Sequence, residues 1–235
     1  MGRRENPVDR TAPEKAKLAD FLRARRHHAQ MTYKQMAARS TVVSAATFER
    51  AASGAVVPSW ETVQEFILAT ADEGDFHPEF FMDRARQLWI KARRATRAPF
   101  YVRQAPDPRL LSSPADLVRA LRRQHVWAGY PTPGEMERMS GPGVLPRTTA
   151  RRIIEGEVLP VDPQQAIAFL RACYVVRAAD LQPWLASAVR VLRDVPSRSR
   201  NLDNWVRAHQ QMVRQAQTES AAQAPPSSSQ GRKAA

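Results

Sequence analysis

Cysteine, histidine clusters and long apolar runs are scarce in this sequence, and each shortage excludes a class of protein. Cys173 is the single cysteine, so no internal disulfide can form and a reducing interior is expected. The five histidines are adjacent or scattered, and no spacing among them suits zinc. No apolar run approaches the about 20 residues of a membrane span, and the charged start MGRRENPVDR lacks the apolar segment of a secretion signal. We therefore expect a cytoplasmic protein with no membrane segment.

Sequence motifs of catalysis are also missing. The chain has no P-loop, no GxGxxG and no nucleophile elbow. The GPG at 141–143 is interpreted as a turn, and the carboxylates of Glu135 and Glu137 are explained by helix capping and surface charge. We predict that the protein is not an enzyme, with no catalytic residue, no metal site and no cofactor.

Basic residues, by contrast, are in excess, and nearly all of them are arginine. The chain has 36 Lys and Arg against 23 Asp and Glu, a net charge of +13, and only five of the basic residues are lysine. The guanidinium group offers a planar fork that suits phosphates and guanine edges. A strongly positive chain favours nucleic acid or an anionic membrane surface as its partner. A GC-rich genome gives the same composition, so charge alone favours nucleic acid only modestly.

An internal repeat is the most informative feature of the sequence. The matched segments are MTYKQM (31–36) with PTPGEM (131–136), ADFLRARRHH (19–28) with ADLVRALRRQ (115–124), and SGAVVP (53–58) with EGEVLP (155–160). The offset between the copies grows along the chain, which places insertions in turns. Apolar residues recur at helical spacing in both copies. We predict an all-α fold of two tandem homologous modules, each of about five helices.

Each copy of the repeat contains a capped helix start. Thr32 is placed as an N-cap whose hydroxyl accepts from the helix backbone, and Gln35 is placed to reach back and complete a capping box. Thr132 and Glu135 repeat this pair, with Pro133 at the first helical position. In both copies the residues that follow indicate a turn, a second short helix and a glycine.

Two short helices joined by a turn, on a scaffold of flanking helices, resemble the helix-turn-helix of the Cro and lambda-repressor (XRE) type. The resemblance lies in MTYKQMAARSTVVSAATFERAASG, where Ser44, Thr47 and Gly54 occupy the places of the Ser-x-x-Thr that opens the recognition helix and of the closing glycine. TFERAASGxxxPSW and LPRTTARRIIEGEVLP look similar to the actinobacterial branch. The resemblance implies DNA binding, usually in transcriptional control. The chain departs from the pattern in Tyr33, where glutamine is common, and in a short first turn without glycine.

The composition divides the chain into five predicted segments. TRAPFYVRQAPDPRLLSSP (96–114) is rich in proline and is typical of a linker. The C-terminal segment has the composition of disorder apart from a predicted helix at 202–215. The segments are a flexible arm at 1–14, an N-terminal helix-turn-helix domain at 15–97, a linker at 98–112, a degenerate C-terminal helix-turn-helix domain at 113–195 and a mostly disordered tail at 196–235. Arg3, Arg4 and Arg10 of the arm are candidates for the minor groove.

The candidate DNA-binding residues follow from the way a recognition helix enters the major groove with its N-terminal end. In the first module they are Thr32, Tyr33 and Lys34 at the start of one helix, and Ser44, Ala45, Ala46, Thr47 and Arg50 on the recognition helix. In the second module they are Arg147, Thr148, Thr149 and Arg151. Alanine and the threonine methyl group suit a thymine methyl group, and arginine suits guanine. The plainer interpretation is a good helix former at the alanines and a solvated charged face balanced by Glu155 and Glu157.

Large apolar side chains at helical spacing are predicted to form the core. They are Phe48, Trp60, Phe66, Ile67, Trp89, Leu121, Trp127, Ile154, Phe169, Leu170 and Trp184.

These features together predict a sequence-dependent DNA-binding transcriptional regulator at the nucleoid, with double-stranded DNA as its partner. A homodimer or a regulatory protein partner stays open. One alternative is a helix-turn-helix scaffold that acts as a protein-interaction module with a sigma factor or another regulator, favoured by the unusual turns and by the segment Leu202–Trp205, which we expect to be exposed. The other is a low-specificity nucleoid-binding protein, which needs only charge.

Overall fold

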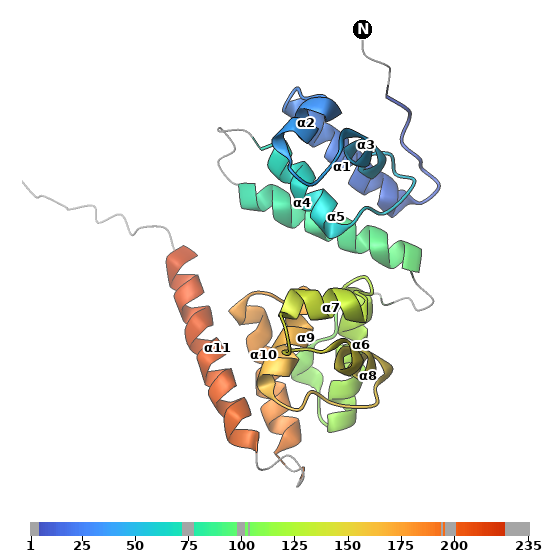
Figure 1. Ribbon diagram of the computed structural model, residues 1–235. Coiled ribbons are helices and arrows are strands. Elements are labelled where there is room, and N and C mark those ends of the chain that lie inside the picture. The colour runs from blue at the N-terminus through green and yellow to red at the C-terminus, as the bar shows by residue number, and fades with distance from the viewer. Residues whose placement is uncertain are drawn as a thin grey trace, which may run out of the picture. The chain divides into compact units, whose positions relative to one another are not determined.

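The computed structural model describes residues 5–71, 78–97, 102, 104–193, 195 and 201–223. Over these residues the secondary structure consists of eleven α-helices and one short 3-10 helix, without a strand, so the predicted all-α class is confirmed. The chain divides into two compact units (Figure 1). Unit 1 comprises residues 1–103 and 126–130, and unit 2 comprises residues 104–125 and 131–235.

Unit 1 contains five helices, four of which begin at a signal that is readable from the local sequence. They are α1 (Pro13–His28), α2 (Tyr33–Arg39), α3 (Ala45–Ala51), α4 (Trp60–Ala69) and α5 (Pro78–Arg97). α1 has proline in its first turn. The predicted capping box of α2 is present, because Thr32 Oγ1 accepts from the Gln35 amide and Gln35 Oε1 accepts from the Thr32 amide at 2.8 Å. Ser44 and Ser59 cap α3 and α4 through their side chains.

The core of unit 1 fixes the two short helices on the longer ones. Phe48 of α3 and Phe66 of α4 are fully buried and meet edge to face, with ring centroids 5.5 Å apart. Met36 anchors α2 in the same core. Trp89 of α5 is buried and its indole N–H donates to the Pro58 carbonyl oxygen at 2.8 Å. Of the predicted core side chains in the whole chain, Trp60, Trp127 and Ile154 are half-buried and the others are buried.

The described part of the predicted N-terminal arm makes contacts with the rest of unit 1. The Asp9 amide donates to the Ser53 carbonyl oxygen at 2.8 Å, and Arg10 pairs with Asp20 at 3.1 Å. Gly54 has φ +78°, and a Cβ there would lie 2.7 Å from the Asp9 carbonyl oxygen, so the segment needs glycine at this contact. Within the predicted flexible arm, Asp9 and Arg10 thus make contacts with other parts of unit 1. Residues 1–4, with Arg3 and Arg4, lie outside the described part of the chain.

Unit 2 contains six α-helices and one short 3-10 helix among its described residues. Its helices are η1 (Pro108–Leu110), α6 (Pro114–Trp127), α7 (Pro133–Ser140), α8 (Arg147–Glu155), α9 (Pro163–Ala172), α10 (Ala178–Leu192) and α11 (Leu202–Gln223). The capping box predicted for α7 is present: Glu135 donates its amide to Thr132 Oγ1 at 3.2 Å and accepts from the Thr132 amide. α8 ends at Gly156, whose φ of +83° is left-handed.

Part of the predicted linker belongs to unit 2. The Ser187 hydroxyl of α10 donates to the Pro108 carbonyl oxygen at 2.6 Å, and Arg190 donates to the Leu111 carbonyl oxygen at 2.8 Å. The Leu111 side chain is buried. Residues 108–111 thus contact α10, while 98–101 and 103 lie outside the described residues.

α11 is a packed helix of unit 2, whereas the sequence predicts a mostly disordered tail at 196–235. It continues to Gln223, beyond the predicted end at 215, and it packs against α10 and α9. Trp205 is 2% exposed, and Met212 is buried two turns later. The helix predicted at 202–215 is therefore present, and it extends eight residues further than the sequence predicts. Residues 224–235 lie outside the described part of the chain.

The start of α6 makes the stability of unit 2 depend on pH. The hydroxyls of Ser112 and Ser113 donate to Asp116 Oδ2 at 2.7 and 2.8 Å, and Arg119 pairs with the same carboxylate. These hydrogen bonds, with those of the serines first, lower the pKa of Asp116 well below its usual range. A carboxyl whose pKa is lower in the folded state stabilises the fold above its unfolded pKa of about 4, and this contribution is lost as the pH falls below that value.

We expect Asp116→Asn to flatten the loss of stability below pH about 4. Denaturant unfolding followed by circular dichroism between pH 3 and pH 7 measures this dependence. Asp203→Asn, which removes an exposed carboxylate from the first turn of α11, is the control. An equal pH dependence in wild type and Asp116→Asn would contradict the assignment.

Candidate nucleic-acid interface

The side chain of one serine makes three hydrogen bonds in the turn between α2 and α3. Ser40, the C-cap of α2, accepts from the amides of Val42 and Val43 at 3.3 and 3.1 Å and donates from its hydroxyl to Glu65 Oε2 at 2.7 Å. Residues 40–44 join the helices without a residue of positive φ. The turn is thus longer than the sequence suggested, and because its backbone stays in ordinary conformations it does not need the usual glycine.

α3 buries one side and exposes the other. Phe48 and Ala51 are buried, while Ser44, Ala46 and Arg50 are exposed. The five residues predicted on this helix, Ser44, Ala45, Ala46, Thr47 and Arg50, form what we call the α3 face. All five have solvent-accessible surface, with Ala45 and Thr47 half-buried.

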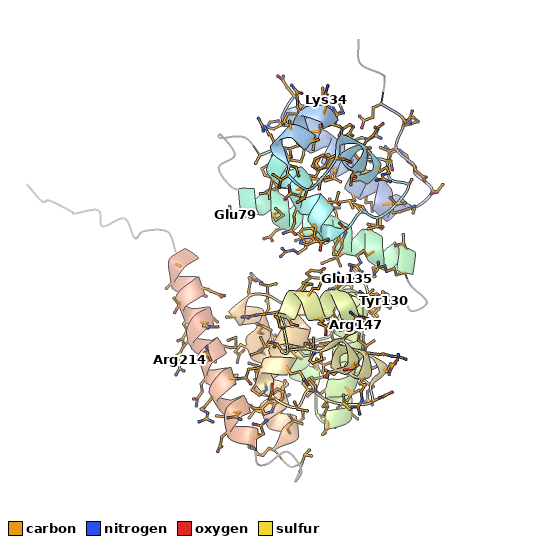
Figure 2. The ribbon with its side chains drawn as sticks, in the orientation of Figure 1. Lys34, Glu79, Tyr130, Glu135, Arg147 and Arg214 are labelled. Carbon is orange, nitrogen blue, oxygen red and sulfur yellow. The ribbon has the colours of Figure 1, made fainter. Side chains whose placement is uncertain are left out.

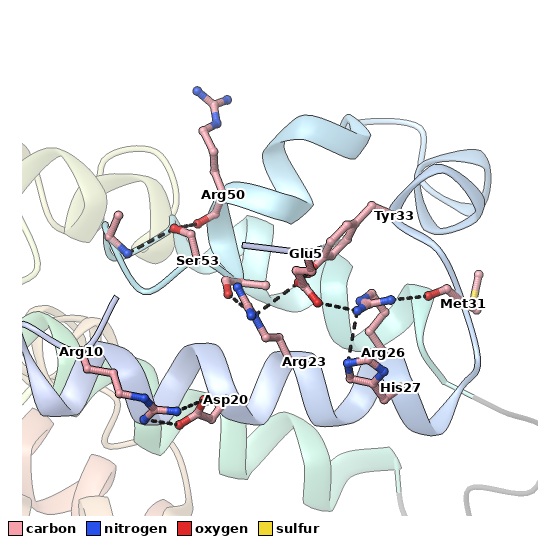
Figure 3. A network of polar contacts seen from close by, with 12 residues as sticks. Glu5, Arg10, Asp20, Arg23, Arg26, His27, Met31, Tyr33, Arg50 and Ser53 are labelled. Atoms are coloured by element: carbon pink, nitrogen blue, oxygen red, sulfur yellow. Dashed lines mark hydrogen bonds and ion pairs between the residues drawn. The ribbon is translucent and has the colours of Figure 1, made fainter. Parts of the chain in front are cut away.

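Hydrogen bonds organise the polar part of the α3 face. The hydroxyls of Ser44 and Thr47 lie 2.9 Å apart, and Arg50 Nη2 donates weakly to Thr47 Oγ1 at 3.4 Å. Figure 3 shows the Arg50 side chain extending away from the rest of unit 1. No side chain before Phe48 on this helix is larger than threonine, so the start of the helix permits close approach of a groove wall.

Sequence reasoning missed two exposed neighbours of the α3 face. Val42 in the turn is 74% exposed, which offers an apolar contact of the kind a thymine methyl group makes. Glu49 is also exposed on α3. The sequence signal for Val42 was its place as a branched apolar residue two positions before Ser44, the N-cap of α3.

The three candidate residues at the start of α2 differ in how far their polar groups already bond to other groups of unit 1. Thr32 uses its hydroxyl within the capping box, since Oγ1 accepts from the Gln35 amide and donates to Gln35 Oε1 at 2.9 Å. Lys34 is exposed on the outer side of α2 (Figure 2). Lys34 is therefore the candidate best placed for a phosphate.

Tyr33 is half-buried and already engaged. Its ring meets Phe66 edge-on with centroids 6.4 Å apart, and the Arg26 guanidinium lies 4.6 Å from its centroid. Its hydroxyl donates to the Glu5 carboxylate. Burial, followed by this hydrogen bond to Glu5, raises the pKa of Tyr33 well above its usual value.

The arginines of α8 are paired with carboxylates. Glu137 of α7 accepts from the Arg147 amide at 3.0 Å and lies 3.6 Å from its Nε. Arg151 pairs with Glu155 at 2.8 Å, which raises the pKa of Arg151. All these side chains are substantially exposed. Figure 2 shows Arg147 at the start of α8.

This pairing distinguishes α8 from α3. α8 begins after Pro146, which gives no side-chain cap, so the Glu137 carboxylate occupies the end of the helix that would meet DNA. Arg152 pairs with Glu157 at 3.2 Å. Thr148 is exposed and Thr149 half-buried. These ion pairs agree with the plainer interpretation of a balanced, solvated face.

Among the residues that the structure describes, no group of three or more His, Cys, Asp or Glu side chains is arranged to hold a metal ion. No helix in the described ranges is long and apolar enough to cross a membrane.

Comparison with known proteins identifies the domain that carries the α3 face. Residues 17–70, from within α1 to just past the end of α4, match the model of a family described as a helix-turn-helix domain. Searches of curated proteins and of solved structures returned no match. The helix-turn-helix prediction is confirmed for these residues, and a domain of this kind implies DNA as a partner.

Proposed function

We propose that the protein binds double-stranded DNA in a sequence-dependent manner and regulates transcription at the nucleoid in the cytoplasm, through a helix-turn-helix of the Cro and lambda-repressor type in unit 1. One observation carries the proposal: the matched domain presents the α3 face to solvent while Phe48 and Ala51 hold the opposite side of the helix in the core. The proposed role needs no catalytic residue and no cofactor.

In the proposed complex, α3 enters the major groove by its N-terminal end. Ala46 and the Thr47 methyl group contact thymine methyl groups, and Arg50 donates to a guanine edge or a phosphate. Lys34 contacts the backbone and fixes the register without reading sequence. Affinity falls with salt, because each phosphate contact releases counterions.

We propose unit 2 as a second, degenerate helix-turn-helix that contributes less to base reading. Its helix order and its capping box at Thr132 and Glu135 support the homology. To contact guanine, Arg147 and Arg151 must first leave Glu137 and Glu155. Exposed ion pairs are weak, about 0–1 kcal/mol each, so unit 2 clamps the backbone more readily than it selects bases.

A protein-interaction module is the second candidate function. The Leu202–Trp205 segment, which the sequence predicts to be exposed, does not support this function, because Trp205 is buried within unit 2. A groove of about 430 Å³ in unit 2, between α7, α9 and α11, supports it instead, with Met139 and Ile167 among its apolar lining and Arg171 among its polar residues.

The deciding experiment is to mix the full chain with sheared DNA from its host at about 200 mM salt and to sequence what stays bound, because this salt suppresses purely electrostatic binding. A few sharp peaks sharing a motif would establish a specific regulator. Broad retention would indicate nucleoid-type binding. Retention of almost no DNA would leave the protein-interaction role.

We expect Thr47→Ala to lower the affinity for the selected site about fivefold to tenfold, and to change the affinity for random DNA much less. Arg147→Ala is expected to have a small and equal effect on both, because Arg147 is paired with Glu137. Titrations of both DNAs at one salt concentration measure the ratio. Equal loss on both DNAs for Thr47→Ala would show that α3 does not read bases.

A further inference from the structure

Three side chains of unit 1 converge on one carboxylate. Arg26 Nη2 lies 2.7 Å from Glu5 Oε2, Arg23 Nε lies 3.3 Å from Glu5 Oε1, and the Tyr33 hydroxyl donates to Oε1 (Figure 3). The side chains of Arg23 and Arg26 are only 16% and 13% exposed, and that of Glu5 is 20% exposed. We call Arg23, Arg26 and Tyr33 the Glu5 cage.

Contacts other than Glu5 hold the Glu5 cage in shape. Arg23 Nε also donates to the Ala52 carbonyl oxygen at 2.8 Å, and Arg26 Nη1 donates to the Met31 carbonyl oxygen at 3.0 Å. The Arg26 guanidinium lies against the Tyr33 ring, 4.6 Å from its centroid. These contacts support both guanidinium groups in addition to their bonds with Glu5.

The Glu5 cage has one more donor than the carboxylate uses. Arg26 Nε is buried and has no hydrogen-bond partner among the described residues. In a guanidinium group the Nε–H and one Nη2–H point to the same side and can bind two oxygens of one anion. Glu5 takes only the Nη2 half of this fork. Two arginines against one carboxylate also leave one positive charge uncompensated.

Glu5 lies in a segment without helix, ahead of the residues that bond this segment to the rest of unit 1. Residues 5–12 contain no helix, and the bonds that fix them nearest to Glu5 include the Asp9 amide to the Ser53 carbonyl oxygen and the exposed pair of Arg10 with Asp20. An exposed ion pair adds little stability. If Glu5 and the residues next to it left their place on unit 1, the Glu5 cage would open without a change in the core.

We propose that the Glu5 cage is a phosphate-binding site, that Glu5 occupies it in the free protein, and that a backbone phosphate of DNA replaces Glu5 in the complex. The proposal rests on the proposed function. We infer that DNA supplies the phosphate because Tyr33 begins α2, next to exposed Lys34. This helix precedes the α3 face in the chain. A phosphate offers more acceptor oxygens than a carboxylate, which matches the unused Arg26 Nε. The N-terminal segment then competes with DNA.

The test compares Glu5→Gln with Asp83→Asn, which removes the same charge from an exposed position on α5. Glu5→Gln is expected to bind both selected and random DNA about threefold to tenfold more tightly than wild type, because a phosphate contact carries no sequence information. Asp83→Asn is expected to change affinity by less than about twofold. Adding Tyr33→Phe to Glu5→Gln, which keeps the ring packing, is expected to remove part of the gain.

A second probe separates failure of the Glu5 cage from failure of the proposed function. Thermal unfolding of each variant is recorded with and without inorganic phosphate, and it also shows that each variant is folded. Tighter DNA binding by Glu5→Gln, reduced when Tyr33→Phe is added, supports the proposal. Unchanged DNA affinity in a protein that does bind DNA overturns it, and so does stabilisation by inorganic phosphate without an effect on DNA. If wild type and Glu5→Gln bind no DNA, the proposed function fails, and the phosphate arm alone decides whether the Glu5 cage binds an oxyanion.

Discussion

Ala46→Glu is expected to lower the affinity of the protein for its selected DNA site about 100-fold. Ala46 is exposed near the start of α3, where the proposed complex brings the helix into the major groove. A glutamate there replaces a small apolar contact by a carboxylate that faces phosphates on both sides of the groove. The added charge also has to lose water without gaining a partner, which costs further binding energy.

The matched control for Ala46→Glu is Gln87→Glu, which adds the same charge at an exposed position on α5. Fluorescence-anisotropy titrations with the selected site, at two salt concentrations, separate the local effect from the effect of net charge. Circular dichroism checks that both variants keep their helices. A loss no greater for Ala46→Glu than for Gln87→Glu would show that α3 lies outside the interface.

Trp205→Ala is expected to lower the free energy of unfolding of unit 2 by about 3–5 kcal/mol. Trp205 is 2% exposed at the start of α11, among the side chains by which α11 packs against α10 and α9. Removing the indole leaves a cavity between helices, and the remaining anchors of α11, Ala208 and Met212, are smaller. A loss of this size is a large part of the stability of a single domain.

Chemical denaturation followed by circular dichroism measures the effect of Trp205→Ala. Two units that unfold separately give two transitions, and only the transition of unit 2 is expected to move. Arg207→Ala, an exposed residue on the same helix, is the control. If Trp205→Ala lowered the stability of unit 2 no more than Arg207→Ala did, α11 would not be part of the core of unit 2.

The short helices that carry the candidate interface are determined by residues close together in the sequence. Thr32 with Gln35, and Thr132 with Glu135, form their capping boxes within one turn, and the Ser44 side chain caps α3 in the same local way. Such bonds need no distant partner, so their residues predict them. The helical spacing of apolar residues likewise predicts the all-α class and most of the buried aromatic side chains.

Only the tertiary structure decided what the polar and weakly patterned segments do. Residues 5–12 and 104–112 look like arm and linker by composition, yet both make hydrogen bonds to residues far away in the sequence. The Asp9 amide donates to the Ser53 carbonyl oxygen, and Arg190 of α10 donates to the Leu111 carbonyl oxygen. The pairing of Glu5 with Arg23 and Arg26 joins a segment without helix to α1. α11 is polar at most positions, and its single tryptophan becomes buried only because α9 and α10 provide a surface for it. Composition predicts whether a segment can fold by itself, whereas the packing of these segments depends on surfaces that exist only once the rest of the chain has folded.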